Sequence, residues 1–203
     1  LEENYNHIKT DFVDCSDFLI RKAKTGNREF LIMVCDGLID SIQLSQMVVS
    51  PILRCDEIDI DTIKKSITNS VELNEAKTFA DCYYYVMSGF AVVLVDGEDK
   101  ALAFGVQSPP ARSVDVPSNE QSTKAPKEAF VEVLNTNKAL LRKRLKTPHL
   151  KLKQIKLASS APMPCVIAYM DDRADKELVS QITLALQSSN LNTLTDFGTL
   201  VPF

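Results

Sequence analysis

The sequence has little of what enzymes and membrane-crossing segments are usually built from. It holds only two histidines, His7 and His149, and neither accompanies a nucleophile or a set of metal ligands. The six glycines are isolated, so there is no glycine-rich loop to hold a phosphate. No apolar run approaches the ~20 residues that a membrane helix needs, and the first residues do not resemble a signal peptide. We therefore expect a soluble, non-enzymatic chain without a cofactor. Because it begins at Leu1 rather than Met, we expect a fragment of a longer protein.

Cysteine pairs are also lacking. The five cysteines form no C-x-x-C pair and are odd in number, which predicts neither a disulfide framework nor a zinc site. Cys35 and Cys165 lie in apolar, strand-like runs, where a free thiol behaves as a small hydrophobic group. The acidic residues at 56–61 and 171–172 are interpreted as a solvated helix start and a strand end. We expect no metal and a reducing, cytoplasm-like compartment.

The net charge of −4 conceals an uneven distribution. Residues 1–120 carry 20 acidic and 11 basic side chains (−9), whereas residues 121–203 carry 7 acidic and 12 basic (+5). The sign changes near a stretch, residues 108–126, that contains four of the nine prolines. We therefore predict an N-terminal α/β subdomain at 1–107, a Pro-rich linker at 108–126, and a C-terminal α/β subdomain at 127–203.

Alternating helical and strand-like patterns predict the α/β class, with small mixed sheets flanked by helices. In the first half, expected helices are 1–10, 41–53, one from about Asp59, and 75–87, and expected strands are 17–24, 30–35, 91–95 and 100–106. In the second half we expect helices at 127–145 and 175–187 and strands at 150–157 and 164–170. The structure of 191–203 is left open.

The predicted helix 127–145 carries polar residues where an apolar stripe is expected. At 100° per residue, Asn137 and Arg144 fall on the same face as Phe130, Leu134 and Leu141. A polar group on a buried face must find hydrogen bonds, and an unpaired charge there costs more. One interpretation is structural: both residues tie the helix to strand ends or to the linker, with Glu120 as a partner. The other is that they line a cleft that touches a ligand or a partner.

Eight basic residues and no acidic one occur between Lys138 and Lys156. Such a stretch suits an anionic membrane surface or nucleic acid. It contains no interleaved aromatic residues, and the whole chain is acidic with a pI near 5.3. We therefore predict no nucleic-acid partner.

A series of fixed residues at uneven spacings is the most specific feature of the chain. They are Arg112, Pro117, Glu120, Pro126, Phe130, Glu132, Asn137, Arg142, Arg144, Pro148 and Leu150. Further matches are Asp36-Gly37-Leu38, Asp96-Gly97 and Ala168-Tyr169-Met170-Asp171. Over about residues 11 to 190 the chain resembles the soluble N-terminal domain of the GerA family, the A subunits of bacterial spore germinant receptors. One departure is Ala125, where the family has glycine before the helix proline.

The resemblance implies a receptor subunit that senses or relays a small germinant, such as an amino acid, a sugar or an ion. It implies assembly with B and C subunits and a parent protein embedded in the spore inner membrane. Candidate ligand or interdomain residues are Arg112, Glu120, Glu132, Asn137, Arg142 and Arg144. By analogy with bilobed binding proteins, the two halves would move about a hinge at 108–126. The alternative is a purely structural assembly module with no ligand site. An enzyme acting on a small metabolite lacks a catalytic constellation.

Overall fold

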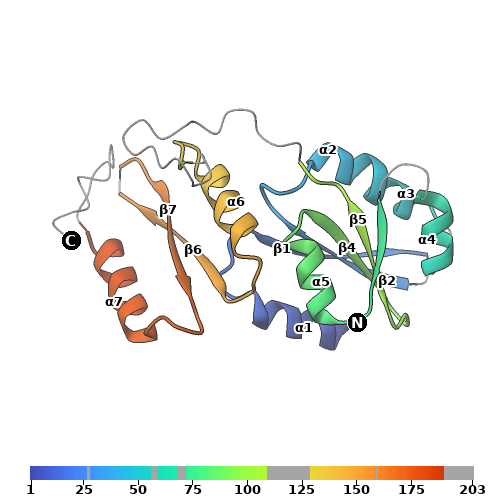
Figure 1. Ribbon diagram of the computed structural model, residues 1–203, viewed down its shortest axis with the longest axis horizontal. Helices are drawn as coiled ribbons and strands as arrows, with labels where there is room; N and C mark the ends of the chain where they lie inside the picture. The colour runs from blue at the N-terminus through green and yellow to red at the C-terminus, as the bar shows by residue number, and fades with distance from the viewer. Residues whose placement is uncertain (27, 56–58, 68–71, 109–128, 159, 190–203) are drawn as a thin grey trace, which may run out of the picture. The chain divides into compact units, whose positions relative to one another are not determined.

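The chain forms two compact units, seen in the computed structural model of Figure 1. The structure describes residues 1–26, 28–55, 59–67, 72–108, 129–158 and 160–189. Unit 1 comprises Leu1–Thr10 and Asp17–Thr147, and unit 2 comprises Asp11–Ser16 and Pro148–Phe203. This division differs from the expected one, because the helix after the expected linker belongs to unit 1 and a short N-terminal segment belongs to unit 2. Nearly all of the expected linker 108–126 lies outside the described residues.

Unit 1 is built on a five-stranded antiparallel sheet with the order β1-β2-β4-β5-β3. Its strands are β1 (Phe18–Thr25), β2 (Arg28–Cys35), β3 (Leu73–Ala76), β4 (Phe90–Val95) and β5 (Ala101–Gly105). The four strands expected in the first half are present and form two hairpins. β1 pairs with β2 from Phe18↔Cys35 to Thr25↔Arg28, and β4 pairs with β5. All six residues of β4 are buried, which places this strand at the centre of the core.

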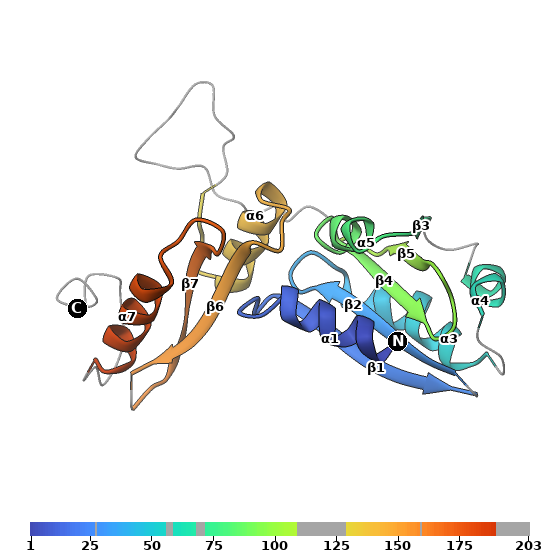
Figure 2. The same ribbon diagram turned by 90° about the horizontal axis from the view of Figure 1, so that it is seen from below.

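Helices cover both faces of this sheet (Figures 1 and 2). On one face, the segment from α2 (Ser41–Gln43) to α4 (Ile60–Ile67) buries Val48, Ile52 and Ile63 in a core that includes Val93 of β4. On the other face lie α1 (Glu2–Asp11) and α5 (Phe79–Val86), whose His7 and Phe79 rings are 4.6 Å apart. Alternate residues of β4 therefore face two helical layers.

The predicted helix 41–53 is present but changes its hydrogen-bonding register. Between α2 and α3 (Ser50–Leu53), residues Leu44–Val49 form a π-helix, η1. The Ser50 N–H donates to the Ser45 carbonyl, five residues back. Pro51 follows at once, and proline has no N–H and needs room at a preceding carbonyl. The wider π turn supplies that room, which local helix propensity did not predict.

The predicted helix 75–87 is wrong over its first residues. β3 (Leu73–Ala76) pairs with β5, and α5 begins only at Phe79. Thr78 caps α5: its side chain accepts from the Asp81 N–H, and the Asp81 carboxylate accepts from the Thr78 N–H. The expected end at residue 87 is close to the observed end at Val86, and Ser88-Gly89 follows the capping residue Met87. Gly89 has φ +87°, and a Cβ there would lie 2.9 Å from the Leu38 carbonyl oxygen.

The helix predicted at 127–145 is shorter in the structure. It is α6 (Leu134–Arg144), and the residues before it, from 129 to 133, are not helical. Its buried residues are Lys138, Ala139, Leu140 and Arg142. Ala139 packs beneath the β2–α2 turn, because the position of a Cβ on Gly37 lies 3.3 Å from the Ala139 Cβ. The buried face is thus rotated from the predicted stripe.

Unit 2 is a hairpin with one helix. β6 (Leu150–Leu157) pairs antiparallel with β7 (Met163–Met170), and α7 (Lys176–Gln187) begins after the capping residue Asp175. The positions of the three elements agree with the predicted ranges. The segment Asp11–Ser16 adds a parallel bridge from Cys15 to Leu152 on the other side of β6.

The α/β class is confirmed. Both sheets are antiparallel where mixed sheets were expected, with the Cys15–Leu152 bridge as the described parallel pairing. Among the described helices, none combines the length and the apolar character that crossing a bilayer requires.

Candidate functional site

Most of the residues that the sequence singled out lie in or next to α6 of unit 1. Arg112 and Glu120 fall outside the described residues, so the proposed Glu120 partner is not seen. Glu132 is exposed and precedes α6. Asn137, Arg142 and Arg144 lie on the helix itself, and the structure gives each of them a different environment.

Asn137 organises the chain just before the helix. Its amide nitrogen donates to the Val131 carbonyl at 2.6 Å, and its oxygen accepts from the Val131 N–H at 2.8 Å. The residue at the N-cap, Val133, has no side chain that can cap the helix. The Asn137 amide therefore satisfies backbone groups that would otherwise lack partners near the helix start. This supports the structural interpretation of Asn137.

Arg144 does not share that buried face, so its predicted phase is wrong. It is exposed, as is Leu145 (42 %), and Phe130 is 66 % exposed before the helix begins. The prediction assumed a helix from 127 with Phe130 and Leu145 as core residues. The true helix starts at Leu134 and presents a different set of residues to the sheet.

Arg142 is the most deeply buried charged residue of α6. It is fully buried, and its guanidinium donates to both carboxylate oxygens of Asp17, from Nε at 2.8 Å and from Nη2 at 3.0 Å. Its Nη1 donates to the Thr147 carbonyl at 2.7 Å. Asp17 is 1 % exposed. The planar fork of arginine suits this two-pronged contact with a carboxylate.

Asp17 and Thr147 occupy special places in the chain. Asp17 is the first residue of unit 1 after the chain leaves unit 2, and Thr147 is the last residue of unit 1 before the chain returns. One arginine side chain therefore binds both ends of this long unit 1 segment. The backbone of Asp17 is also fixed, because its carbonyl accepts from the Asp36 N–H at 2.7 Å.

The neighbouring residues in unit 2 are held just as closely. The Ser16 N–H donates to the Leu152 carbonyl at 3.1 Å, and the Leu152 N–H donates to the Asp14 carbonyl at 2.9 Å. The His149 carbonyl accepts from the Asp171 N–H at 2.9 Å. The chain passes between the units at Ser16–Asp17 and at Thr147–Pro148, and we call these two places the crossings. At each of them, a hydrogen-bonded residue of one unit is followed within one or two positions by a hydrogen-bonded residue of the other.

Sequence reasoning missed Asp17, which it placed only at a strand start. Arg142 and Asp17 are 125 residues apart, and no local period links them. The one available signal was a basic residue among apolar helix positions, which predicts an acidic partner somewhere but not where.

The basic stretch from Lys138 to Lys156 is partly explained by burial and internal contacts. Three of its members, Lys138, Arg142 and Lys151, are buried. The Lys151 ammonium donates to the Asp11 carbonyl at 2.6 Å and lies 3.2 Å from Asp171. These buried groups are not available to a membrane surface.

His149 and two carboxylates form a small charged cluster in unit 2. Ligand atoms of His149, Asp171 and Asp172 lie within 4.8 Å of one another. His149 Nδ1 is 2.8 Å from Asp171 Oδ1. Partial burial alone would raise the pKa of Asp171, but the hydrogen bonds with His149 and Lys151 outweigh it and lower that pKa. Lys151 also lies 3.2 Å from Asp171, so one carboxylate of the cluster is part of an ion pair.

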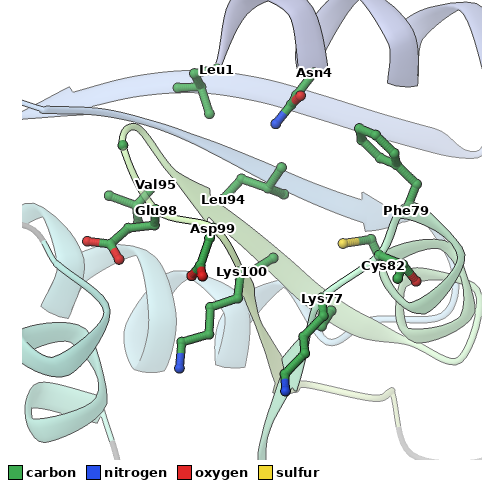
Figure 3. Close-up of a pocket in the computed structure, with 14 residues that line it drawn as sticks. Leu1, Asn4, Lys77, Phe79, Cys82, Leu94, Val95, Glu98, Asp99 and Lys100 are labelled. Carbon is green, nitrogen blue, oxygen red and sulfur yellow. The ribbon is translucent and has the colours of Figure 1, made fainter.

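Unit 1 contains a partly open surface cavity of about 300 Å³ (Figure 3). It lies between the start of α1, the start of α5 and the β4–β5 hairpin. The apolar lining includes Phe79, Cys82 and Leu94, and burial raises the pKa of the Cys82 thiol to about 11, so the thiol stays protonated.

The charged groups at the rim of this cavity have other partners. Lys100 Nζ lies 3.0 Å from Glu75, and Glu98 lies 2.8 Å from Arg28. Figure 3 shows the Lys77 and Lys100 side chains running away from Leu1 and Asn4 at the opposite rim. Converging polar groups are the usual mark of a small-molecule site, and they are weakly developed here.

Comparison with known proteins gives consistent matches. A family model described as "Bacillus/Clostridium GerA spore germination protein" matches residues 6–203. Spore germination protein B1 of Bacillus subtilis is 30 % identical over 98 % of this chain and 42 % of its own length. Spore germination protein A1 of the same organism is 26 % identical over 91 % of this chain and 39 % of its own. The chain thus spans about two fifths of these relatives.

A solved structure shares the fold. The N-terminal domain of the A subunit of the Bacillus megaterium spore germinant receptor GerK3 superposes with a TM-score of 0.72 at 24 % identity. The match covers 97 % of this chain and 80 % of that one. With the family model matched from residue 6 to the last residue, the chain belongs to the GerA family of Bacillus and Clostridium spore germination proteins.

Proposed function

We propose that this chain senses or relays a small germinant signal within a GerA-family receptor and assembles with the other receptor subunits. The observation that carries the proposal is the family match over residues 6–203. The germinant would be an amino acid, a sugar or an ion, and the partners would be B and C subunits. The parent protein would sit in the spore inner membrane through a region that these residues do not include.

In this proposal the two units respond to a ligand or a neighbouring subunit by adjusting their relative angle. The stretch 108–126, which the sequence suggested as the hinge, has unit 1 residues on both sides. The hinge candidates between the units are instead the crossings at Ser16–Asp17 and Thr147–Pro148, where the chain passes from one unit to the other. Arg112, Glu120, Glu132, Asn137, Arg142 and Arg144 stay the candidate residues for ligand or interdomain contacts.

The alternative is an assembly module without a ligand site. One observation favours it: the rim charges Lys100 and Glu98 of the described cavity are already engaged by Glu75 and Arg28. A relay function would then depend on subunit contacts alone.

Ligand-observed NMR of the chain against a panel of amino acids, sugars and potassium salts separates the two. Saturation transfer to a panel member, abolished by an excess of the same compound, supports sensing by this chain. If no compound binds, but Arg142→Lys in the parent receptor slows germination, the relay and assembly reading is supported. Absence of both effects would overturn the proposed function.

A further inference from the structure

We infer that Arg142 is a positioning residue, which holds the two chain crossings of unit 1 in fixed register so that movement at one is transmitted to the other. This inference rests on the proposed function, since it describes how a signal would pass through the same two units. In this inference, Arg142 positions the two crossings in addition to its effect on the stability of the fold.

The geometry first points to coupling. The Asp17 carboxylate accepts hydrogen bonds from Nε and Nη2 of Arg142, and the Thr147 carbonyl accepts one from Nη1. A guanidinium is flat and rigid, so these acceptors are held in one plane and at one spacing. Displacement of Thr147 therefore also displaces Asp17, although 129 residues lie between them in the chain.

At both crossings, almost every residue is held by a hydrogen bond within its own unit. Ser16 is bonded within unit 2 through its N–H, and the next residue, Asp17, is bonded within unit 1 through its carboxylate and its carbonyl. At the other crossing, Thr147 is held in unit 1 and His149 in unit 2, with only Pro148 between them. The proline ring fixes one of the few torsions available there.

A third passage of the chain between units occurs within α1, from Thr10 to Asp11. Asp11 is the last residue of α1, so this passage lies at the helix end. In this inference, rotation of one unit against the other uses torsions at Ser16–Asp17 and at Thr147–Pro148. Arg142 binds the residue on the unit 1 side of both, which is where a positioning group is most effective.

Arg142→Lys tests this with little change in charge. A lysine ammonium is a point donor on a flexible stem, so it can hold Asp17 or Thr147 but lacks the rigid fork that fixes both. Lys143→Arg is the matched control, a change of the same kind on the exposed side of the same helix. Asp17→Asn is the second variant, because it keeps the side-chain shape and one acceptor while removing the charge.

The measurement is residual dipolar coupling by NMR, with alignment fitted to unit 1 and to unit 2 separately. Chemical shifts away from α6 report whether each unit keeps its fold. We expect the wild-type chain and Lys143→Arg to give nearly equal alignment magnitudes for the two units. In Arg142→Lys or Asp17→Asn the magnitude of unit 2 should fall relative to unit 1, while both units stay folded.

Germination assays on the parent receptor separate this inference from the proposed function. Loss of positioning should lower the rate at saturating germinant while leaving the half-saturating concentration unchanged. Equal alignment in wild type and in whichever of the two variants folds would overturn the inference, whatever the germination rates are. If both variants unfold unit 1, Arg142 is a stability residue and the inference is also overturned.

Discussion

Unit 1 and unit 2 differ in how completely they bury the apolar side chains of their strands and helices. In unit 1, β4 lies in mid-sheet and every one of its residues is buried between two helical layers. In unit 2, β7 has no fully buried residue, and α7 leaves Leu178 (53 %), Ile182 (41 %) and Leu184 (63 %) exposed. A two-stranded sheet under one helix has too few layers to enclose its apolar side chains. Unit 1 therefore encloses the larger core, although single apolar side chains such as Ile42 (68 %) are exposed there as well.

The edges of the two sheets differ in the same direction. β1, an edge of the unit 1 sheet, carries Arg21, Lys22 and Lys24, and the other edge strand, β3, has four residues. β7 has eight residues, none of them charged, and among the described residues no strand pairs with its outer side. Charges and short length protect sheet edges from unwanted pairing. The edges of the unit 1 sheet thus have charges and short length, whereas β7 has only Pro164 near one end.

The largest expected effect is a loss of unfolding free energy when a buried side chain of unit 1 is truncated, compared with truncation of an exposed side chain of unit 2. Leu102→Ala removes a fully buried side chain of β5, and such truncations cost about 2–5 kcal/mol of unfolding free energy. Leu178→Ala removes an exposed side chain of α7, and surface changes of this kind stay within about 0.5 kcal/mol. Urea denaturation of both variants measures the difference. Comparable losses would show that α7 is buried in solution.

Local stability should follow the same comparison. The amides of β4 should exchange with solvent only on global unfolding, because both faces of that strand are covered. The amides of β7 should exchange faster, through opening of unit 2 alone. Hydrogen exchange followed by mass spectrometry, with peptides from each strand, reports this directly. Uniform protection across both strands would mean that the units unfold as one.

A smaller effect is expected from exchanging the edge protection. Ala168→Lys places a charge on an exposed position of β7 and should leave the melting temperature nearly unchanged while reducing any association at high concentration. The converse variant, Arg21→Val with Lys24→Val, removes protection from β1 and should increase association. Sedimentation velocity over a concentration series measures both. If Ala168→Lys associates as the wild type does, β7 is not the exposed edge that matters.

The smallest effect concerns pH. Glu75 lies between Lys64 and Lys100, whose hydrogen bonds lower the pKa of its carboxyl to about 2 from an ordinary 4.5. A carboxyl with a lowered pKa stabilises the fold fully above pH 4.5, and that stability is lost as the pH falls toward 2. Glu75→Gln should therefore flatten the decline in stability over this window. Because the group is at the surface, the effect should shrink in high salt.

Asp171→Asn is the counterpart of that test in unit 2. The pKa of Asp171 is also lowered, so the sign of the effect is the same, with stability lost as the pH falls. Its partner Lys151 is buried, whereas Lys64 is not, and salt should therefore screen the Asp171 contribution less. Equal salt dependence for both variants would remove this difference between the units.

Elements with local signals were predictable from the sequence. The hairpins of unit 1, β6, β7 and α7 all have apolar runs bounded by turn or cap residues, such as Asp175 before α7. β3 was not found, since its pairing with β5 is non-local and its residues read as the start of a helix. The Thr78-x-x-Asp81 cap was visible in the sequence and would have placed the start of α5 correctly.

The candidate site was predictable only in part. Arg142 was among the named residues, but its partner Asp17 was not, because nothing local connects a strand start to a helix 125 residues later. Arg144 was placed on the buried face because the helix was assumed to begin too early. A helical wheel fixes relative angles, and the face that is buried depends on a sheet that the wheel does not contain.

The exclusion of solvent from the Arg142–Asp17 pair has a consequence for how this pair responds to its surroundings. An ion pair at a surface weakens or strengthens with the salt and water around it. A pair in which both members are already excluded from solvent is indifferent to those changes, and arginine stays charged at any physiological pH. The contact of Arg142 with Asp17 within unit 1 should therefore keep one geometry when the salt or the amount of water around the protein changes.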